Sequence, residues 1–167
     1  SIFDERAALN KDLGADYAYV DATALNMVRG PWAFDVLVTE NMFGDILSDL
    51  GAGLIGGMGM APSADIGDNH AVFQPCHGTA PDIVGTGKAN PTAMILSAAM
   101  MLEWLGDVKS NEACSRAADL IVTAVDRAFE SGDLVPFELG GDAGTDAIFK
   151  AVYTAFDGLQ ANQETAA

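Results

Sequence analysis

Short apolar runs rich in β-forming residues alternate along this chain with longer segments whose apolar residues recur at helical spacing. Residues 34–39 form the clearest strand-like run, and shorter runs occupy 16–20 and 71–74. Residues 111–129, in contrast, carry apolar side chains at the three- and four-residue intervals of one helix face. Strands that alternate with helices predict an α/β chain, in which helices pack in layers around a sheet.

Capping and turn residues set the expected limits of the helices. Asp21, Asn41, Thr92 and Thr145 are placed to cap helices, and Gly30-Pro31 is placed to stop one. The helices expected on this basis span residues 3–13, 21–29, 41 to the glycines at 51–59, 92–105, 111–129 and 145–159. Residues 160–167 are expected to be disordered, as chain ends commonly are.

The charge of the chain narrows the classes of partner. Its 24 acidic residues against 8 basic ones give a formal net charge of −16. Nucleic acids and anionic membranes are bound through basic surfaces, so both are disfavoured. No apolar run is long enough to span a membrane, and the first residues do not resemble a signal peptide. The two cysteines have no metal-binding spacing, which suggests free thiols in a reducing cytoplasm. The chain enters an amphipathic segment directly after Ser1, and this abrupt start suggests a fragment of a longer protein.

Two carboxylates four residues apart, Asp45 and Asp49, follow the strand-like run at 34–39. Residues at this spacing share one helix face, where like charges oppose helix formation by about 0.2–0.5 kcal/mol. A cation between them would reverse the sign of that effect, and Mg²⁺ and Mn²⁺ favour carboxylate oxygens. Asp21 could supply a third ligand. The alternative is an ordinary solvated helix face that carries two acids.

The segment from Gln74 to Pro91 is too long for a simple connector, and loops of this length in compact domains are commonly functional. Its glycines would let a ligand approach the backbone closely. His77 offers a ring to an adenine, and Asp82 offers acceptors to ribose hydroxyls. The common G-x-G-x-x-G fingerprint is absent, and His77 taken alone fits a packed or capping histidine better than a ligand contact.

Several segments together resemble the isocitrate/isopropylmalate dehydrogenase family of β-decarboxylating dehydrogenases. The resemblance extends in order over nearly the whole chain. It is carried by residues 21–24, 34–49, 77–82, 89–92, 95–102 and 139–145. It implies the C-terminal half of a two-domain fold. Residues 1–55 would be part of the metal-site and dimerisation domain, and residues 56–167 the C-terminal part of the cofactor-binding domain.

The resemblance also implies roles for individual residues. Asp21, Asp45 and Asp49 match the family's metal aspartates for Mg²⁺ or Mn²⁺, with Asp21 reaching the site of the neighbouring subunit in a homodimer. Residues of the adenosine loop are matched by His77, Gly78, Thr79, Ala80, Pro81, Asp82 and Asn90. NADP-preferring members carry a Lys-Tyr pair where this chain has Asp82-Ile83, so NAD is the expected cofactor.

The chain matches only the second half of such proteins, and the lysine and tyrosine that act as base and acid have no counterpart in it. Its substrate is expected to be a small 2-hydroxy acid, most like isopropylmalate, with homoisocitrate, isocitrate and tartrate as alternatives. The fragment itself is expected to be inactive. A non-catalytic nucleotide-binding regulatory subunit and an α/β domain without a ligand are the alternative hypotheses. Gln74 and Cys76 depart from the family pattern, which commonly has glutamate and valine there.

Overall fold

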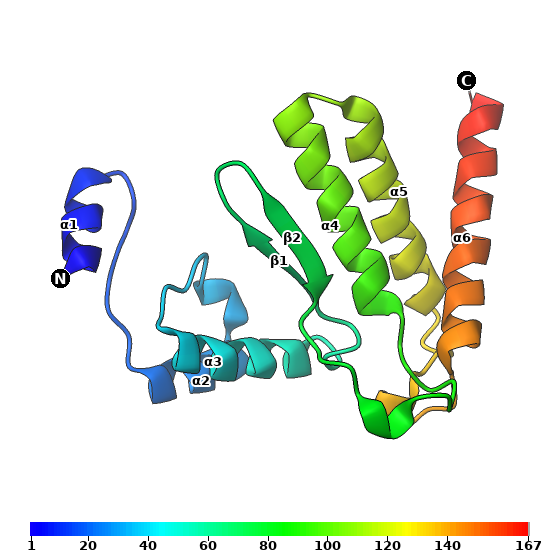
Figure 1. Ribbon diagram of the computed structural model, residues 1–167, viewed down its shortest axis with the longest axis horizontal. Helices are drawn as coiled ribbons and strands as arrows, with labels where there is room; N and C mark the ends of the chain where they lie inside the picture. The colour runs from blue at the N-terminus through cyan, green and yellow to red at the C-terminus, as the bar shows by residue number, and fades with distance from the viewer. Residues whose placement is uncertain (167) are drawn as a thin grey trace. The chain divides into compact units, whose positions relative to one another are not determined.

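A computed structural model describes residues 1–166 of the chain, with side chains up to residue 161 (Figure 1). The chain divides into two compact units, residues 1–51 and 52–167. Each unit is described by itself. In the described part of the chain, no helix has both the length and the apolar composition needed to cross a membrane.

The first unit is built from helices. It contains α1 (Ile2–Leu9), α2 (Val20–Arg29), the short 3-10 helix η1 (Pro31–Ala33) and most of α3 (Asn41–Leu54). At the start of α1, the Ser1 hydroxyl accepts a hydrogen bond from the Asp4 amide at 3.3 Å. The Tyr17 hydroxyl donates to the Asp4 carboxylate at 2.7 Å, which ties the following segment back to this helix.

Two strands predicted in this unit are absent. Residues 34–39 lie outside regular secondary structure, as do 16–19, while Val20 already belongs to α2. A strand exists only with a partner to which its backbone can hydrogen-bond. The described chain pairs no segment with either run, so their β-forming side chains do not produce a sheet. The predicted helix at 3–13 is also shorter and ends at Leu9.

The second unit contains the sheet. Strands β1 (Pro62–Ile66) and β2 (Ala71–Pro75) form an antiparallel hairpin in which Ala64 lies opposite Phe73. β2 confirms the strand expected at 71–74, whereas β1 was not predicted. α4 (Thr92–Lys109) packs on this hairpin, and the rings of Phe73 and Trp104 lie 6.0 Å apart.

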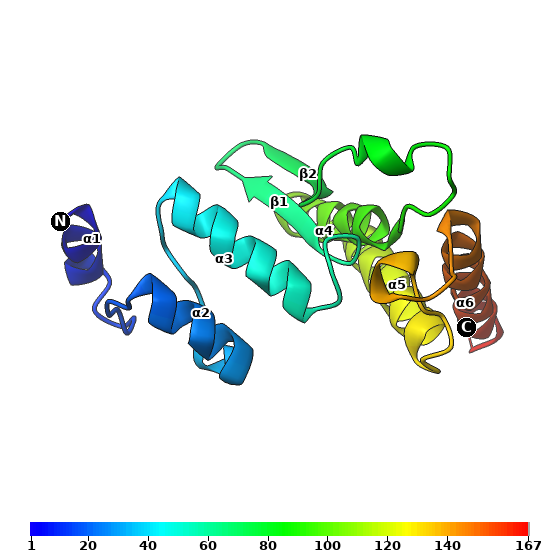
Figure 2. The ribbon, with the colours of Figure 1, turned by 90° about the horizontal axis from the view of Figure 1, so that it is seen from below.

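The core of the second unit lies among three long helices, α4, α5 (Glu112–Phe129) and α6 (Thr145–Ala166) (Figure 1 and Figure 2). Ala124, Val125 and Val152 are buried at its centre, packed against partly buried residues that include Leu96 and Phe156. α5 confirms the predicted helix at 111–129, with the Asn111 side chain accepting from the Ala113 amide.

In the second unit, the C-terminal ends of two helices differ from the prediction. α4 continues to Lys109, beyond the expected Leu105, and ends at Ser110 in the left-handed conformation. α6 continues to Ala166 through the tail that was expected to be disordered, since that tail contains no proline or glycine to stop a helix. Residue 167 lies outside the described residues.

Candidate functional site

The two neighbouring carboxylates predicted as metal ligands lie on α3, one turn apart. Asp45 and Asp49 are both exposed, and the Asn41 amide donates to the Asp45 carboxylate at 2.9 Å. Asn41 begins α3 as its first residue, so this bond runs along the helix and does not cap it. Two accessible carboxylates at this spacing suit a hard divalent cation, which takes oxygen ligands and keeps several waters.

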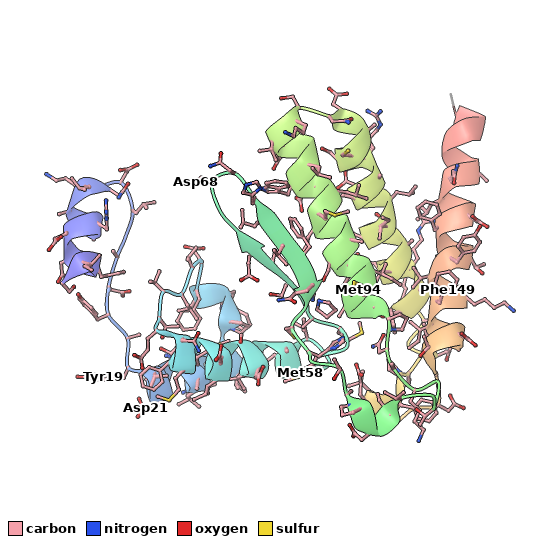
Figure 3. All side chains as sticks on the ribbon, in the orientation of Figure 1. Tyr19, Asp21, Met58, Asp68, Met94 and Phe149 are labelled. Atoms are coloured by element: carbon pink, nitrogen blue, oxygen red, sulfur yellow. The ribbon has the colours of Figure 1, made fainter. Side chains whose placement is uncertain are left out.

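Asp21 lies in the first turn of α2, which begins one residue earlier than predicted, so Tyr19 rather than Asp21 occupies the N-cap position, without a side-chain capping bond (Figure 3). Its carboxylate is exposed and accepts from the amide of Ala22 at 2.8 Å. Within the described residues of this single chain, no three acidic, histidine or cysteine side chains come together as a metal site. The structure therefore brings Asp45 and Asp49 onto one face but does not gather Asp21 with them.

The predicted nucleotide loop follows β2 and contains one short 3-10 helix, η2 (Pro81–Ile83). Ala80, just before η2, adopts the left-handed conformation with φ of 42°, and Gly85 and Gly87 have φ of 75° and 70°. These glycines thus supply backbone conformations that other residues rarely adopt. The loop is an exposed, sharply turning segment rather than a packed connector.

The candidate cofactor residues of this loop fall into two groups. His77, Gly78, Thr79, Ala80, Pro81 and Asp82 are all exposed. A ring nitrogen of His77 lies 2.8 Å from the Gly78 carbonyl oxygen, so this histidine is neither packed in a core nor capping a helix. Asn90, in contrast, is buried at 8% exposure.

Asn90 uses its side chain inside the protein. Its carbonyl oxygen accepts from the Thr92 amide at 3.0 Å, which satisfies a free donor at the start of α4. Its amide donates to the Glu138 carboxylate at 3.0 Å. Sequence reasoning missed Glu138, although the adjoining Leu139–Thr145 segment was among those carrying the resemblance. That likeness was the available signal.

Comparison with known proteins identifies the family. Residues 2–152 match the sequence pattern described as isocitrate/isopropylmalate dehydrogenase. The chain belongs to the isocitrate/isopropylmalate dehydrogenase family. This confirms the resemblance inferred from residues 21–145, because the match spans the segment with the aspartates and the segment with the loop.

Individual members of the isocitrate/isopropylmalate dehydrogenase family are similar in sequence to this chain. The isocitrate/homoisocitrate dehydrogenase of Thermus thermophilus is 53% identical over 140 residues, covering 84% of this chain and 40% of that protein. A Caenorhabditis elegans protein, named as the probable mitochondrial subunit alpha of isocitrate dehydrogenase [NAD], is 48% identical over 151 residues, covering 90% of this chain and 40% of that one. The chain thus spans about two fifths of the length of these relatives.

A solved member of the family has the same fold over nearly all of this chain. The crystal structure of isocitrate dehydrogenase from Methylococcus capsulatus superposes with a TM-score of 0.82 at 45% identity. The superposition covers 93% of this chain and 44% of the other. The predicted fold class, part of the two-domain isocitrate/isopropylmalate dehydrogenase-like fold, is confirmed.

Proposed function

We propose that this chain is part of an oxidoreductase that uses NAD and Mg²⁺ or Mn²⁺ to oxidise and decarboxylate a small 2-hydroxy acid. In this reaction class, hydride passes from the hydroxyl-bearing carbon to the nicotinamide, and the β-carboxylate leaves as CO₂. The carrying observation is that one family match includes both the α3 carboxylates and the exposed loop after β2. The prediction of isopropylmalate stays a prediction, because relatives of this chain are named for isocitrate, homoisocitrate and isopropylmalate alike.

The α3 pair supplies the proposed metal ligands. When bound, the ion would act as a Lewis acid on the substrate's oxygen atoms. Asp45 and Asp49 would hold it with anionic oxygen atoms that are already solvent-accessible. In a single copy of this chain we expect only weak binding, because Asp21 is not gathered with the pair.

Mn²⁺ binding followed by electron paramagnetic resonance tests these ligands. Asp45→Asn and Asp49→Asn should each remove most of the binding. Asp126→Asn is the matched control, because Asp126 and Glu130 are exposed acids at the same four-residue spacing on and just after α5. Equal Mn²⁺ affinity in all four chains would contradict the assignment.

Asp21 is proposed to complete the metal site of a neighbouring copy in a homodimer. Residues 1–55 would form this contact, and their exposed apolar side chains support it, since extensive apolar exposure marks interaction surfaces. Trp32 is 84% exposed and Val36 82%. The 167-residue chain should therefore sediment as a dimer at micromolar concentration. A monomer at every concentration tested would contradict this assembly.

Mixed chains test whether the metal site is shared. Asp21→Asn and Asp45→Asn should each bind Mn²⁺ poorly as pure proteins. In a mixed dimer, one site would contain neither substitution, so mixing should restore part of the binding. No gain on mixing would show that Asp21 does not act across subunits.

The preference for NAD is proposed to rest on Asp82. Its exposed carboxylate in the first turn of η2 can accept from ribose hydroxyls, and it would repel a 2′-phosphate. Hydrogen bonds to a charged group contribute about 1.5–3 kcal/mol, so NAD and NADP should differ by a few kcal/mol.

Calorimetric titration with both nucleotides tests this preference. Asp82→Asn should weaken NAD binding and reduce the discrimination against NADP. Asp68→Asn is the control, since Asp68 is an exposed acid in the turn between β1 and β2 (Figure 3). In a longer active protein, Asp82→Lys with Ile83→Tyr should shift the preference toward NADP. Equal use of both nucleotides by the unchanged protein would show that Asp82 is not the discriminator.

A further inference from the structure

The C-terminal end of the exposed loop is tied to two distant parts of the second unit. The Met60 sulfur accepts from the Asn90 amide at 3.2 Å. The other long-range contacts come from residues 136–145, here called the anchor segment. It includes the 3-10 helix η3 (Phe137–Leu139) and ends at the first residue of α6. The loop with η2 and the anchor segment lie beside each other, as Figure 1 shows in green and orange. Contacts run from the anchor segment to each of the loop residues 87, 88, 89 and 90.

Thr145 makes the first of these contacts, to carbonyl groups of the loop backbone. The Thr145 amide donates to the Gly87 carbonyl at 2.8 Å, and the Thr145 hydroxyl donates to the Ala89 carbonyl. The backbone of Gly87 also comes so close to Gly144 that a side chain at 144 would collide with it. One threonine at the start of α6 thus fixes two carbonyl groups of the loop.

Pairs of side chains make the other contacts between the loop and the anchor segment. The Lys88 ammonium lies 5.0 Å from the centre of the Phe137 ring, within the range of a cation–π contact. The Glu138 carboxylate accepts from the buried Asn90 amide at 3.0 Å. A bond between a charged acceptor and a buried amide is stronger than a neutral one, and its loss leaves a buried donor unpaired.

Gly59 makes room for the Glu138–Asn90 contact. A Cβ atom at this position would lie 2.6 Å from both carboxylate oxygens of Glu138 and 2.8 Å from the Cβ of Asn90. The Gly59 carbonyl accepts from the Ala93 amide at 2.8 Å, so this backbone is itself fixed to the first turn of α4. The glycine and the start of α4 together set where Glu138 and Asn90 meet.

The middle of the loop, residues 77–86, has no hydrogen bond to the anchor segment or to another distant part of the described structure. From residue 77 to 86, its hydrogen bonds are local, such as the Ile83 amide to the Ala80 carbonyl and the Thr86 hydroxyl to the Ile83 carbonyl. His77 and Asp82 belong to this part. They lie in a short, exposed turn between two held ends: the Cys76 amide donates to the Ala61 carbonyl at 3.3 Å just before His77, and residues 87–90 are held after Asp82.

We propose that Glu138 and Thr145 are positioning residues for nucleotide binding, which hold residues 87–90 so that His77 and Asp82 can meet one ligand. This inference rests on the proposed role of the loop in binding NAD. Asn90 acts through the shape of the loop, because both ends of its amide group are bonded within the protein. The fraction of molecules with a competent loop then scales the apparent nucleotide affinity.

Hydrogen–deuterium exchange of the ligand-free 167-residue chain tests the anchoring directly. Glu138→Ala should accelerate amide exchange about tenfold in the peptides that contain the Thr92 and Thr145 amides, which donate to Asn90 and Gly87. A tenfold change corresponds to about 1.4 kcal/mol. Exchange within α5 should stay the same. Glu138→Gln should restore protection, because its amide oxygen can still accept from Asn90. Glu103→Ala, an exposed glutamate on α4, is the matched control.

Thr145 provides an independent variant if Glu138→Ala does not fold. Thr145→Val removes the hydroxyl at nearly constant shape and should accelerate exchange in the same peptides, whereas Thr145→Ser should not. Unchanged exchange of these amides in both Glu138→Ala and Thr145→Val would overturn the anchoring.

NAD titration then separates this inference from the proposed function. Glu138→Ala should weaken NAD binding about tenfold, and Glu138→Gln should bind as the unchanged chain does. Normal affinity in a variant whose anchoring amides exchange faster would overturn the positioning role. Failure of the unchanged chain to bind NAD would instead count against the proposed function, while the exchange result would still decide the anchoring.

Discussion

Residues 1–51 and residues 52–167 differ in how far they bury apolar side chains of the same kind. In the first unit only Thr23 and Leu47 are buried, and Val36 and Val38 are 82% and 77% exposed. In the second, Ile148 is fully buried and Val125 and Val152 are 4% and 6% exposed. Since burial, rather than apolar content, provides most of the stability of a fold, the second unit has the means to hold its shape alone and the first does not.

The difference bears on the two proposed ligand sites. The nucleotide loop leaves a hairpin packed on α4, and the anchor segment that holds the loop leads into α6. The metal carboxylates lie on helices with little buried surface. We therefore expect nucleotide binding to need only the second unit, and metal binding to need a partner surface that covers the first.

The largest expected effect follows from truncating the core of the second unit. Ile148→Ala should lower the free energy of unfolding of that unit by about 2–5 kcal/mol, because a fully buried isoleucine leaves a cavity. Urea unfolding followed by Trp104 fluorescence, in a Trp32→Phe background, measures this unit specifically.

The matched change in the first unit is Val36→Ala. At 82% exposure it should alter stability by less than about 0.5 kcal/mol. Equal losses from the two substitutions would break the contrast between a unit with a core and a unit without one.

A smaller loss of stability is expected from a substitution at the point where the loop and the anchor segment of the second unit meet. Gly59→Ala should cost about 1–3 kcal/mol, because the new methyl group must displace Glu138 and Asn90. The cost should fall in Glu138→Ala, which removes the obstructing carboxylate. A double-mutant cycle measures this coupling, and strict additivity would show that the two positions do not meet.

In the first unit, removing one charge from α3 should change the stability of that helix by a smaller amount. Asp49→Asn removes a like-charged pair while leaving the Asn41–Asp45 bond, so α3 should gain about 0.2–0.5 kcal/mol without metal. Carbon-13 chemical shifts report this helicity. Mn²⁺ should stabilise α3 in the unchanged chain only, and an Mn²⁺ effect on both chains would contradict the pairing of Asp45 with Asp49.

The smallest expected effect is a loss of stability at low pH. The Ser1 and Tyr17 hydroxyls and the N-terminal ammonium hydrogen-bond to Asp4 and lower the pKa of its carboxyl below the ordinary value of 3.8. A lowered pKa in the folded state means stabilisation that is present above 3.8 and lost as the pH falls through the lower value. Shifts of α1 should show this loss, and Asp4→Asn should abolish it while Glu5→Gln should not.

The sequence predicted best those elements whose signals are local. Helical spacing from Asn111 to Phe129 gave α5 almost to the residue, and the exposed loop after β2 was located from its length and glycines. The runs at 16–20 and 34–39 failed as strands because a strand also needs a partner, which local sequence does not specify. β1 was missed for the same reason, since its pairing with β2 is what makes it a strand.

The candidate site was predicted as a set of residue types rather than as a set of contacts. The four-residue spacing was enough to place Asp45 and Asp49 on one helix face. The bond between Asn90 and Glu138 joins residues 48 positions apart, so no local pattern could indicate it. The role of Asn90 as a ligand contact stays a prediction, and the structure adds that its side chain joins the loop, the anchor segment and α4.

The most direct test of nucleotide binding by the loop after β2 is a nitrogen-15 NMR titration of the 167-residue chain with NAD and, separately, with NADP. We expect NAD to shift amides of residues 77–90 and of the anchor segment, to leave residues 1–51 unchanged, and to bind more tightly than NADP. Shifts confined to residues 1–51, or equal affinity for the two nucleotides, would contradict this assignment.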